Sequence, residues 1–171
     1  MDVTDHDQKI EAAQKLHEEA QQIRGRIVNS VAVIERDIAI ILTDYFCAQD
    51  DAKKELFYSK VAEKLSLQKK KAILLDIIKR DYPKYWSDEN HILKHIQSIQ
   101  EFRNKLAHSV VDVSDEALSR PIKEGVGFIQ WNKGKPISAE EFQEMNVKIN
   151  MVLSALTDIK RLLPFIEGPL D

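Results

Sequence analysis

The chain has 171 residues and a formal net charge of −3, with 43% hydrophobic and 31% charged residues. This length suits one domain, and a chain of this size buries roughly 70% of the surface that it exposes when unfolded. The composition excludes wholesale disorder. A single cysteine, Cys47, excludes an internal disulfide and a zinc site made of cysteine pairs.

Two further sequence features bear on localisation. No apolar run approaches the ~20 residues that a membrane-spanning helix requires. The stretch from Met1 to Asp7 is acidic and polar, unlike a signal peptide. We therefore expect a cytoplasmic protein that has no membrane partner.

The scarcity of chain-breaking residues predicts an all-α fold. Five glycines and five prolines are about half the usual share, and before Pro121 only Gly25 and Pro83 interrupt the chain. β-sandwiches and barrels need many such turn residues. The expected architecture is an up-and-down helical bundle with one small β-hairpin inserted before the last helix.

The first part of the chain predicts two helical segments. Residues 1–22 carry six acidic and two basic side chains, so we expect an acidic N-terminal helix or extension there. Residues 23–164 are expected to form a single helical domain, followed by a tail over residues 165–171. The domain's first helix should end near Ala48, because seven apolar positions follow the three- and four-residue steps of one helix face. These positions are Ile23, Ile27, Val31, Ile34, Ile38, Ile41 and Tyr45.

Start and stop signals delimit the middle helices. Asp50 or Asp51 should begin a short helix, and Ser66 should cap the next one, which Pro83 ends. Ser87 is expected to start a longer helix whose apolar stripe continues to Leu106.

The last third combines a helical turn, a strand pair and a closing helix. Residues 114–119 predict a short helical turn. Residues 125–137 predict a β-hairpin, because β-favouring residues precede the turn residues 132–135. Residues 138–141 form a capping box that should open the last helix, and Pro164 should stop that helix.

One segment carries residues suited to chemistry. Arg103 occupies a position of the apolar stripe where an aliphatic residue is expected, and Asn104 and His108 are four residues apart on one helix face. The long side chain of Arg103 can reach over that face. A guanidinium, an amide and an imidazole can therefore converge on one anion, such as a phosphate.

These residues resemble the HEPN family, whose signature is an arginine, often followed by a polar residue, and a histidine four to six residues further on. The resemblance implies a helical bundle that acts as a homodimer without metal or cofactor. It also implies endoribonuclease activity, in which the ribose 2′-hydroxyl attacks the adjacent phosphate and leaves a 2′,3′-cyclic phosphate. Family members often serve as toxins with a cognate antitoxin, or in defence against phage.

The resemblance also implies roles for individual residues. His108 would act as general base or acid, Arg103 would stabilise the transition state, and Asn104 would orient the phosphate or the imidazole. Glu35, which borders the apolar stripe of the first long helix, would pair with Arg103 and hold it. Five basic residues would guide the RNA backbone, unless they simply form a solvated helix face. They are Lys69, Lys70, Lys71, Lys79 and Arg80.

Other interpretations of these features remain open. Arg103 and Glu35 can form a purely structural ion pair, and His108 can bond the last carbonyls of its helix. His91 and His95 have a spacing that can bind metal, although solvated helix positions are the simpler interpretation and we expect no metal site. The whole chain can be a non-catalytic HEPN-like module that binds a nucleotide or a protein. It can also be a helical regulator that docks its acidic N-terminal helix on a partner.

Overall fold

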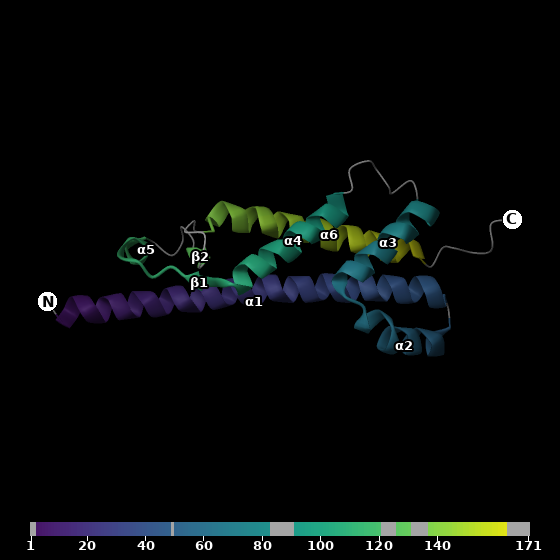
Figure 1. The fold of residues 1–171 in the computed structure, drawn as a ribbon, viewed down its shortest axis with the longest axis horizontal. Coiled ribbons are helices and arrows are strands. Elements are labelled where there is room, and N and C mark those ends of the chain that lie inside the picture. Colours follow the sequence, from purple (N-terminus) through teal and green to yellow (C-terminus); the bar gives the residue numbers. More distant parts are fainter. Residues whose placement is uncertain (1–2, 49, 83–90, 121–125, 131–136, 164–171) are drawn as a thin grey trace. The chain divides into compact units, whose positions relative to one another are not determined.

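The computed structural model describes residues 3–48, 50–82, 91–120, 126–130 and 137–163, and these residues are mostly helical (Figure 1). A two-stranded antiparallel sheet accompanies the helices. The predicted predominance of helix is therefore confirmed. The helical elements are α1 (Val3–Cys47), α2 (Asp51–Lys60), the 3-10 turn η1 (Ala62–Lys64), α3 (Leu67–Asp81), α4 (His91–Ala107), α5 (Asp115–Ser119) and α6 (Ala139–Leu162), and the strands are β1 (Ser109–Val111) and β2 (Phe128–Gln130).

The chain divides into two compact units. Unit 1 comprises Met1–Ser30 and Ile99–Val147, and unit 2 comprises Val31–Ser98 and Lys148–Asp171. Helices α1, α4 and α6 each contribute residues to both units. Within the parts of the chain that the structure describes, every helix lacks the extended apolar stretch of a bilayer-spanning segment.

Helix α1 is one uninterrupted helix of 45 residues. The sequence suggested a separate acidic segment up to Gln22, but the helix passes this position and Gly25 without a break (Figure 1). Gly25 lies in open space, so its cost is only the ~1 kcal/mol of backbone entropy that a helical glycine carries. Leu16 and Ala20 are buried in unit 1, so tertiary contacts sustain the helix before Gly25.

The helix starts predicted at Asp50, Ser66 and Ser138 are confirmed by side-chain caps, whereas the start predicted at Ser87 lies outside the described residues. Asp50 accepts a hydrogen bond from the backbone N–H of Lys53 at 3.0 Å, and Ser66 caps α3. At the start of α6, the hydroxyl oxygen of Ser138 accepts from the N–H of Glu141 at 3.2 Å. The Glu141 carboxylate in turn accepts from the N–H of Ser138 at 3.0 Å. This reciprocal pair is the capping box expected from the sequence.

Strand β2 lies within the hairpin predicted over residues 125–137, and the strand that pairs with it in the described sheet comes earlier in the sequence. β2 pairs antiparallel with β1, placing Ser109 opposite Gln130 and Val111 opposite Phe128. The predicted turn at residues 132–135 lies outside the described residues. Beyond it, the backbone N–H of Ile137 donates to the Phe128 carbonyl at 3.1 Å. A three-residue strand directly after a helix shows no alternating pattern of its own, so β1 could not be recognised from the sequence.

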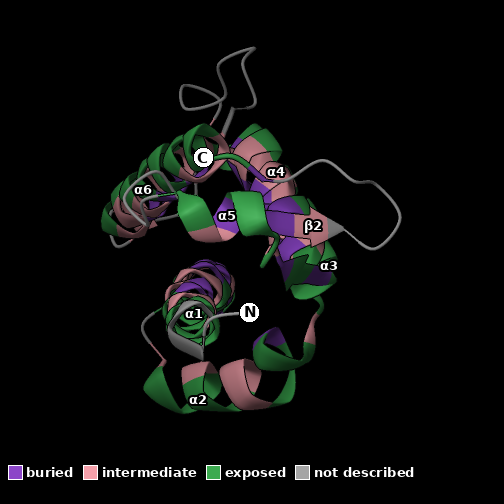
Figure 2. Cartoon of the chain, turned by 90° about the vertical axis from the view of Figure 1, so that its left-hand side faces the viewer, coloured by how far each residue is buried: buried purple, intermediate pink, exposed green. Residues whose placement is uncertain are grey.

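Each unit has its own apolar core. In unit 1, the ring of buried Phe128 lies 5.6 Å from that of Phe142, which lies 5.3 Å from that of Phe102. In unit 2, the fully buried side chains come from α1, α3, α4 and α6. Helix α2 contributes no buried residue and is green and pink throughout in Figure 2. The largest fully buried side chains of unit 2 are Ile34, Ile38, Ile41, Leu42, Leu74, Ile96, Val152 and Leu156.

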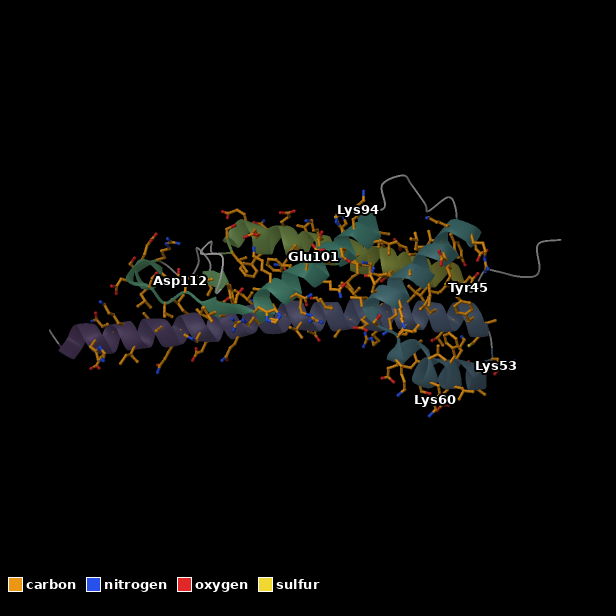
Figure 3. All side chains as sticks on the ribbon, viewed as in Figure 1. Tyr45, Lys53, Lys60, Lys94, Glu101 and Asp112 are labelled. Atoms are coloured by element: carbon orange, nitrogen blue, oxygen red, sulfur yellow. The ribbon has the colours of Figure 1, made fainter. Side chains whose placement is uncertain are left out.

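A polar cluster joins the ends of α1 and α3 in unit 2. The Tyr45 hydroxyl, at the end of α1 (Figure 3), donates a hydrogen bond to the Asp81 carboxylate. Arg80 donates to the Tyr45 oxygen and to Asp81. Hydrogen bonds from Arg80 and Tyr45 hold the pKa of the Asp81 carboxyl below its ordinary value.

This cluster predicts an acid-sensitive contribution to stability. The folded-state pKa of Asp81 is lowered, so its stabilising effect is present above the unfolded-state pKa of about 3.9 and is lost as pH falls through the folded value. Asp81→Asn should therefore lower the urea midpoint at pH 7 and leave it nearly unchanged at pH 2. Asp76→Asn, an exposed position on the same helix, is the control. An equal loss at both pH values in Asp81→Asn would contradict the prediction.

Candidate functional site

The three residues of the predicted motif lie at the C-terminal end of α4. Arg103 and Asn104 belong to its last turns, and His108 forms the turn between α4 and β1. The Arg103 Nη1 donates a hydrogen bond to the Asn104 Oδ1 at 3.0 Å. The backbone N–H of His108 donates to the Asn104 carbonyl at 3.3 Å. The guanidinium and the amide are thus in contact, and the imidazole belongs to His108, the first residue after the helix.

Arg103 and His108 are accessible to a ligand. Arg103 is half-buried, and within its own unit, as far as the structure describes it, its guanidinium pairs with no carboxylate. His108 is exposed, and its imidazole has no hydrogen-bond partner among the described residues. It is therefore not bonded to the last carbonyls of α4. Both side chains can therefore still bind an anion from outside their unit.

Contacts within unit 1 hold the segment around the motif. Lys105 forms an ion pair with Glu141 of α6, with 3.0 Å between Nζ and Oε1. The Ser109 hydroxyl donates to the Lys105 carbonyl at 2.6 Å. The last turn of α4 is therefore tied to the capping box of α6 and to the first residue of β1.

Arg24 of α1 is a residue that the sequence interpretation missed. Its Nη2 donates a hydrogen bond to the Ser109 carbonyl, directly after His108. Its guanidinium carbon lies 5.1 Å from the centroid of the Phe128 ring, within the range of a cation–π contact. The only feature of the sequence that could have indicated a buried role for Arg24 is its place at the border of the apolar stripe, next to Ile23 and three residues before Ile27.

Glu35 has a different partner from the one that the resemblance implies. In unit 2 its Oε1 lies 3.0 Å from the Nζ of Lys70, whose side chain is only 3% exposed. The carboxylate therefore balances a buried ammonium. A pair between Glu35 and Arg103 would join the two units, and it stays a prediction.

The five basic residues on α3 do not form one solvated face. Lys70 and Lys71 are buried, and the Nζ of Lys71 donates to the Gln97 Oε1 at 2.7 Å. Arg80 is held by Tyr45 and Asp81. Burial removes Lys70 and Lys71 from the residues that can follow an RNA backbone, which leaves Lys69, Lys79 and Arg80 on the surface.

A groove lies between α3 and α4 in unit 2. Its volume is about 560 Å³. The side chains of Lys71 and Lys94 bring two positive charges to its lining, which includes no carboxylate. Lys94 projects from the first turns of α4 (Figure 3). Ala72, Leu75 and Leu93 add an apolar wall.

The remaining candidate residues do not assemble into a metal site where the structure describes them. Within these residues, no group of three or more His, Cys, Asp or Glu side chains is placed to hold a metal ion. The side chain of His91 lies outside the described part of the chain.

The pair of Glu35 and Lys70 predicts a specific stability pattern. Glu35→Ala should lower the free energy of unfolding by about 1–3 kcal/mol, because it leaves a buried ammonium without its carboxylate. The double variant Glu35→Ala/Lys70→Met should recover most of this loss, as measured by urea denaturation. Lys69→Met, on an exposed neighbouring residue, should stay within about 0.5 kcal/mol of the parent. Additive losses in the double variant would contradict a direct pair.

Comparisons of this chain with protein-family models, with curated proteins and with solved structures find no match.

Proposed function

We propose that this protein is a metal-independent endoribonuclease of the HEPN type, with its site at the end of α4. One observation carries the proposal. A half-buried guanidinium whose described partner is a neutral amide lies five residues before an exposed imidazole. An arginine that pairs with no described carboxylate of its own unit can direct its planar guanidinium at a phosphate, and histidine has the pKa range best suited to proton transfer near neutral pH.

The proposed reaction needs one base, one acid and one cation. His108 takes the proton from the ribose 2′-hydroxyl, and the O2′–P bond forms. The P–O5′ bond then breaks, and the 5′-oxygen receives a proton from the imidazolium of His108 in a second copy. Arg103 stabilises the charge on the phosphorane-like transition state, and Asn104 orients the phosphate with its NH₂ group. The products are a 2′,3′-cyclic phosphate and a 5′-hydroxyl.

The need for an acid and a base explains why we propose a homodimer. One copy supplies one motif, so a second copy would provide the second histidine. The exposed basic residues Lys69, Lys79 and Arg80 would add attraction for the RNA backbone. By the same resemblance, we propose a cytoplasmic toxin or phage-defence role with an antitoxin as protein partner.

The proposal predicts the effect of three substitutions on cleavage of a mixed RNA in EDTA. His108→Ala should reduce the rate about 10²- to 10⁴-fold, because proton transfer is lost. Arg103→Ala should reduce the rate about 10²- to 10³-fold, because the transition state loses its cation. His17→Ala, which changes an exposed histidine of α1, should leave the rate unchanged. Products should carry 2′,3′-cyclic phosphate ends.

Two results would overturn the nuclease proposal. The first is equal cleavage by the parent and His108→Ala, which would indicate a contaminating nuclease. The second is the absence of cleavage by the parent protein over a broad set of RNA substrates at protein concentrations that favour dimers.

The groove between α3 and α4 favours a second candidate function, a non-catalytic module that binds a nucleotide. The exposed ammonium of Lys94 provides charge for a phosphate, and the aliphatic wall suits the face of a base. This function would need neither His108 nor Arg103.

A titration with AMP tests the second candidate. Binding should shift the methyl NMR signals of Leu75 and Leu93 in a saturable manner. Lys94→Gln should weaken binding about two- to fivefold, as expected for one exposed ion pair, whereas Lys60→Gln on α2, another exposed lysine, should have no effect. If the methyl signals do not respond, the groove does not bind nucleotides.

A further inference from the structure

The proposed function leaves the role of Arg24 unassigned. Arg24 belongs to α1, about 80 residues from the motif in sequence, yet its Nη2 donates to the carbonyl of Ser109. Its Nε is buried and has no hydrogen-bond partner among the described residues. An N–H group buried in this way costs free energy, so other contacts must hold the guanidinium in place.

Two contacts of the Arg24 guanidinium do this. The first is its hydrogen bond to the Ser109 carbonyl, which is stronger than a bond between neutral groups because the donor is charged. The guanidinium also lies over the Phe128 ring, at 5.1 Å from the centroid, and Phe128 is fully buried in the unit 1 core. Arg24 is therefore attached at once to the first residue of β1 and to the first residue of β2.

Ser109 is held at three points. Its carbonyl accepts from Arg24, its hydroxyl donates to the Lys105 carbonyl at 2.6 Å, and its backbone pairs with Gln130 in the sheet. The residue is only 6% exposed. Ser109 is thus a fixed point of the backbone, immediately after the end of α4.

His108 depends on this fixed point. Among the described residues its imidazole has no partner that could orient it, in contrast to catalytic histidines that an acidic residue holds. The backbone between the last turn of α4 and Ser109 sets the direction of its Cα–Cβ bond. Whatever holds the Ser109 carbonyl therefore limits where the imidazole can lie.

We propose that Arg24 is a positioning residue that clamps Ser109 and thereby fixes the backbone that carries His108 at the end of α4. The effect of this clamp on cleavage rests on the proposed nuclease function, whereas its effect on backbone motion can be measured without RNA. Lysine cannot replace arginine here, because an ammonium lacks the planar group that donates to a carbonyl while lying over a ring.

The experiment compares Arg24→Gln and Arg24→Lys with the matched control Arg26→Gln, which changes an exposed arginine on the same helix. Backbone ¹⁵N order parameters of His108 and Ser109 should be about 0.85 in the parent and control, and below about 0.6 in Arg24→Gln. Arg24→Lys should also reduce them, although it keeps the charge. If Arg24→Gln fails to fold, Arg24→Lys provides the decisive comparison.

Measurements of kcat and KM distinguish a positioning role of Arg24 from a contribution of its charge. Loss of positioning should reduce kcat about 10- to 100-fold in both Arg24 variants and leave KM nearly unchanged. An equal rise in KM in Arg24→Gln and Arg26→Gln, without a change in kcat, would show that Arg24 contributes only charge and would overturn the proposal.

The two proposals fail in different ways. Unchanged order parameters at His108 and Ser109 in the Arg24 variants would overturn the clamp, whatever the activity. Reduced order parameters, in a protein whose cleavage does not depend on His108, would support the clamp and reject the nuclease.

Discussion

The apolar face of α1 is the constraint on which the rest of the structure depends. The helix supplies Leu16, Ala20 and Ile27 to the core of unit 1, and Ile34 and Ile38 to the core of unit 2. Burial of this face stabilises the fold through the hydrophobic effect. It also determines what lies at the borders of the face, where polar side chains must find partners inside the protein.

Two border positions of α1 show this effect. In unit 1, Arg24 contacts the Ser109 carbonyl and the Phe128 ring. In unit 2, Glu35 neutralises the buried Lys70. Both residues are charged side chains next to an apolar stripe, but Arg24 acts on the segment that carries His108, whereas Glu35 acts on the interior of α3. The two residues therefore occupy similar sequence positions but stabilise different parts of the structure.

The sequence predicted the helices and their starts more accurately than the partners of its charged residues. Capping at Asp50, Ser66 and Ser138 depends on neighbours within about three residues, so it is visible in the sequence. The strand β1 and the burial of Lys70 depend on distant segments. A run of lysines is typical of a solvated face, and only the packing of α3 shows which of them are buried.

For the candidate site, the sequence by itself determined that Arg103, Asn104 and His108 are neighbours at the end of a helix, because helical periodicity places residues four apart on one face. Only the tertiary structure decided that β1 follows His108 directly and that Arg24 holds the next carbonyl. The physical reason is the range of the interactions. Periodicity and caps act within one turn of helix, whereas strand pairing and a hydrogen bond across 85 positions of sequence exist only once the chain has folded.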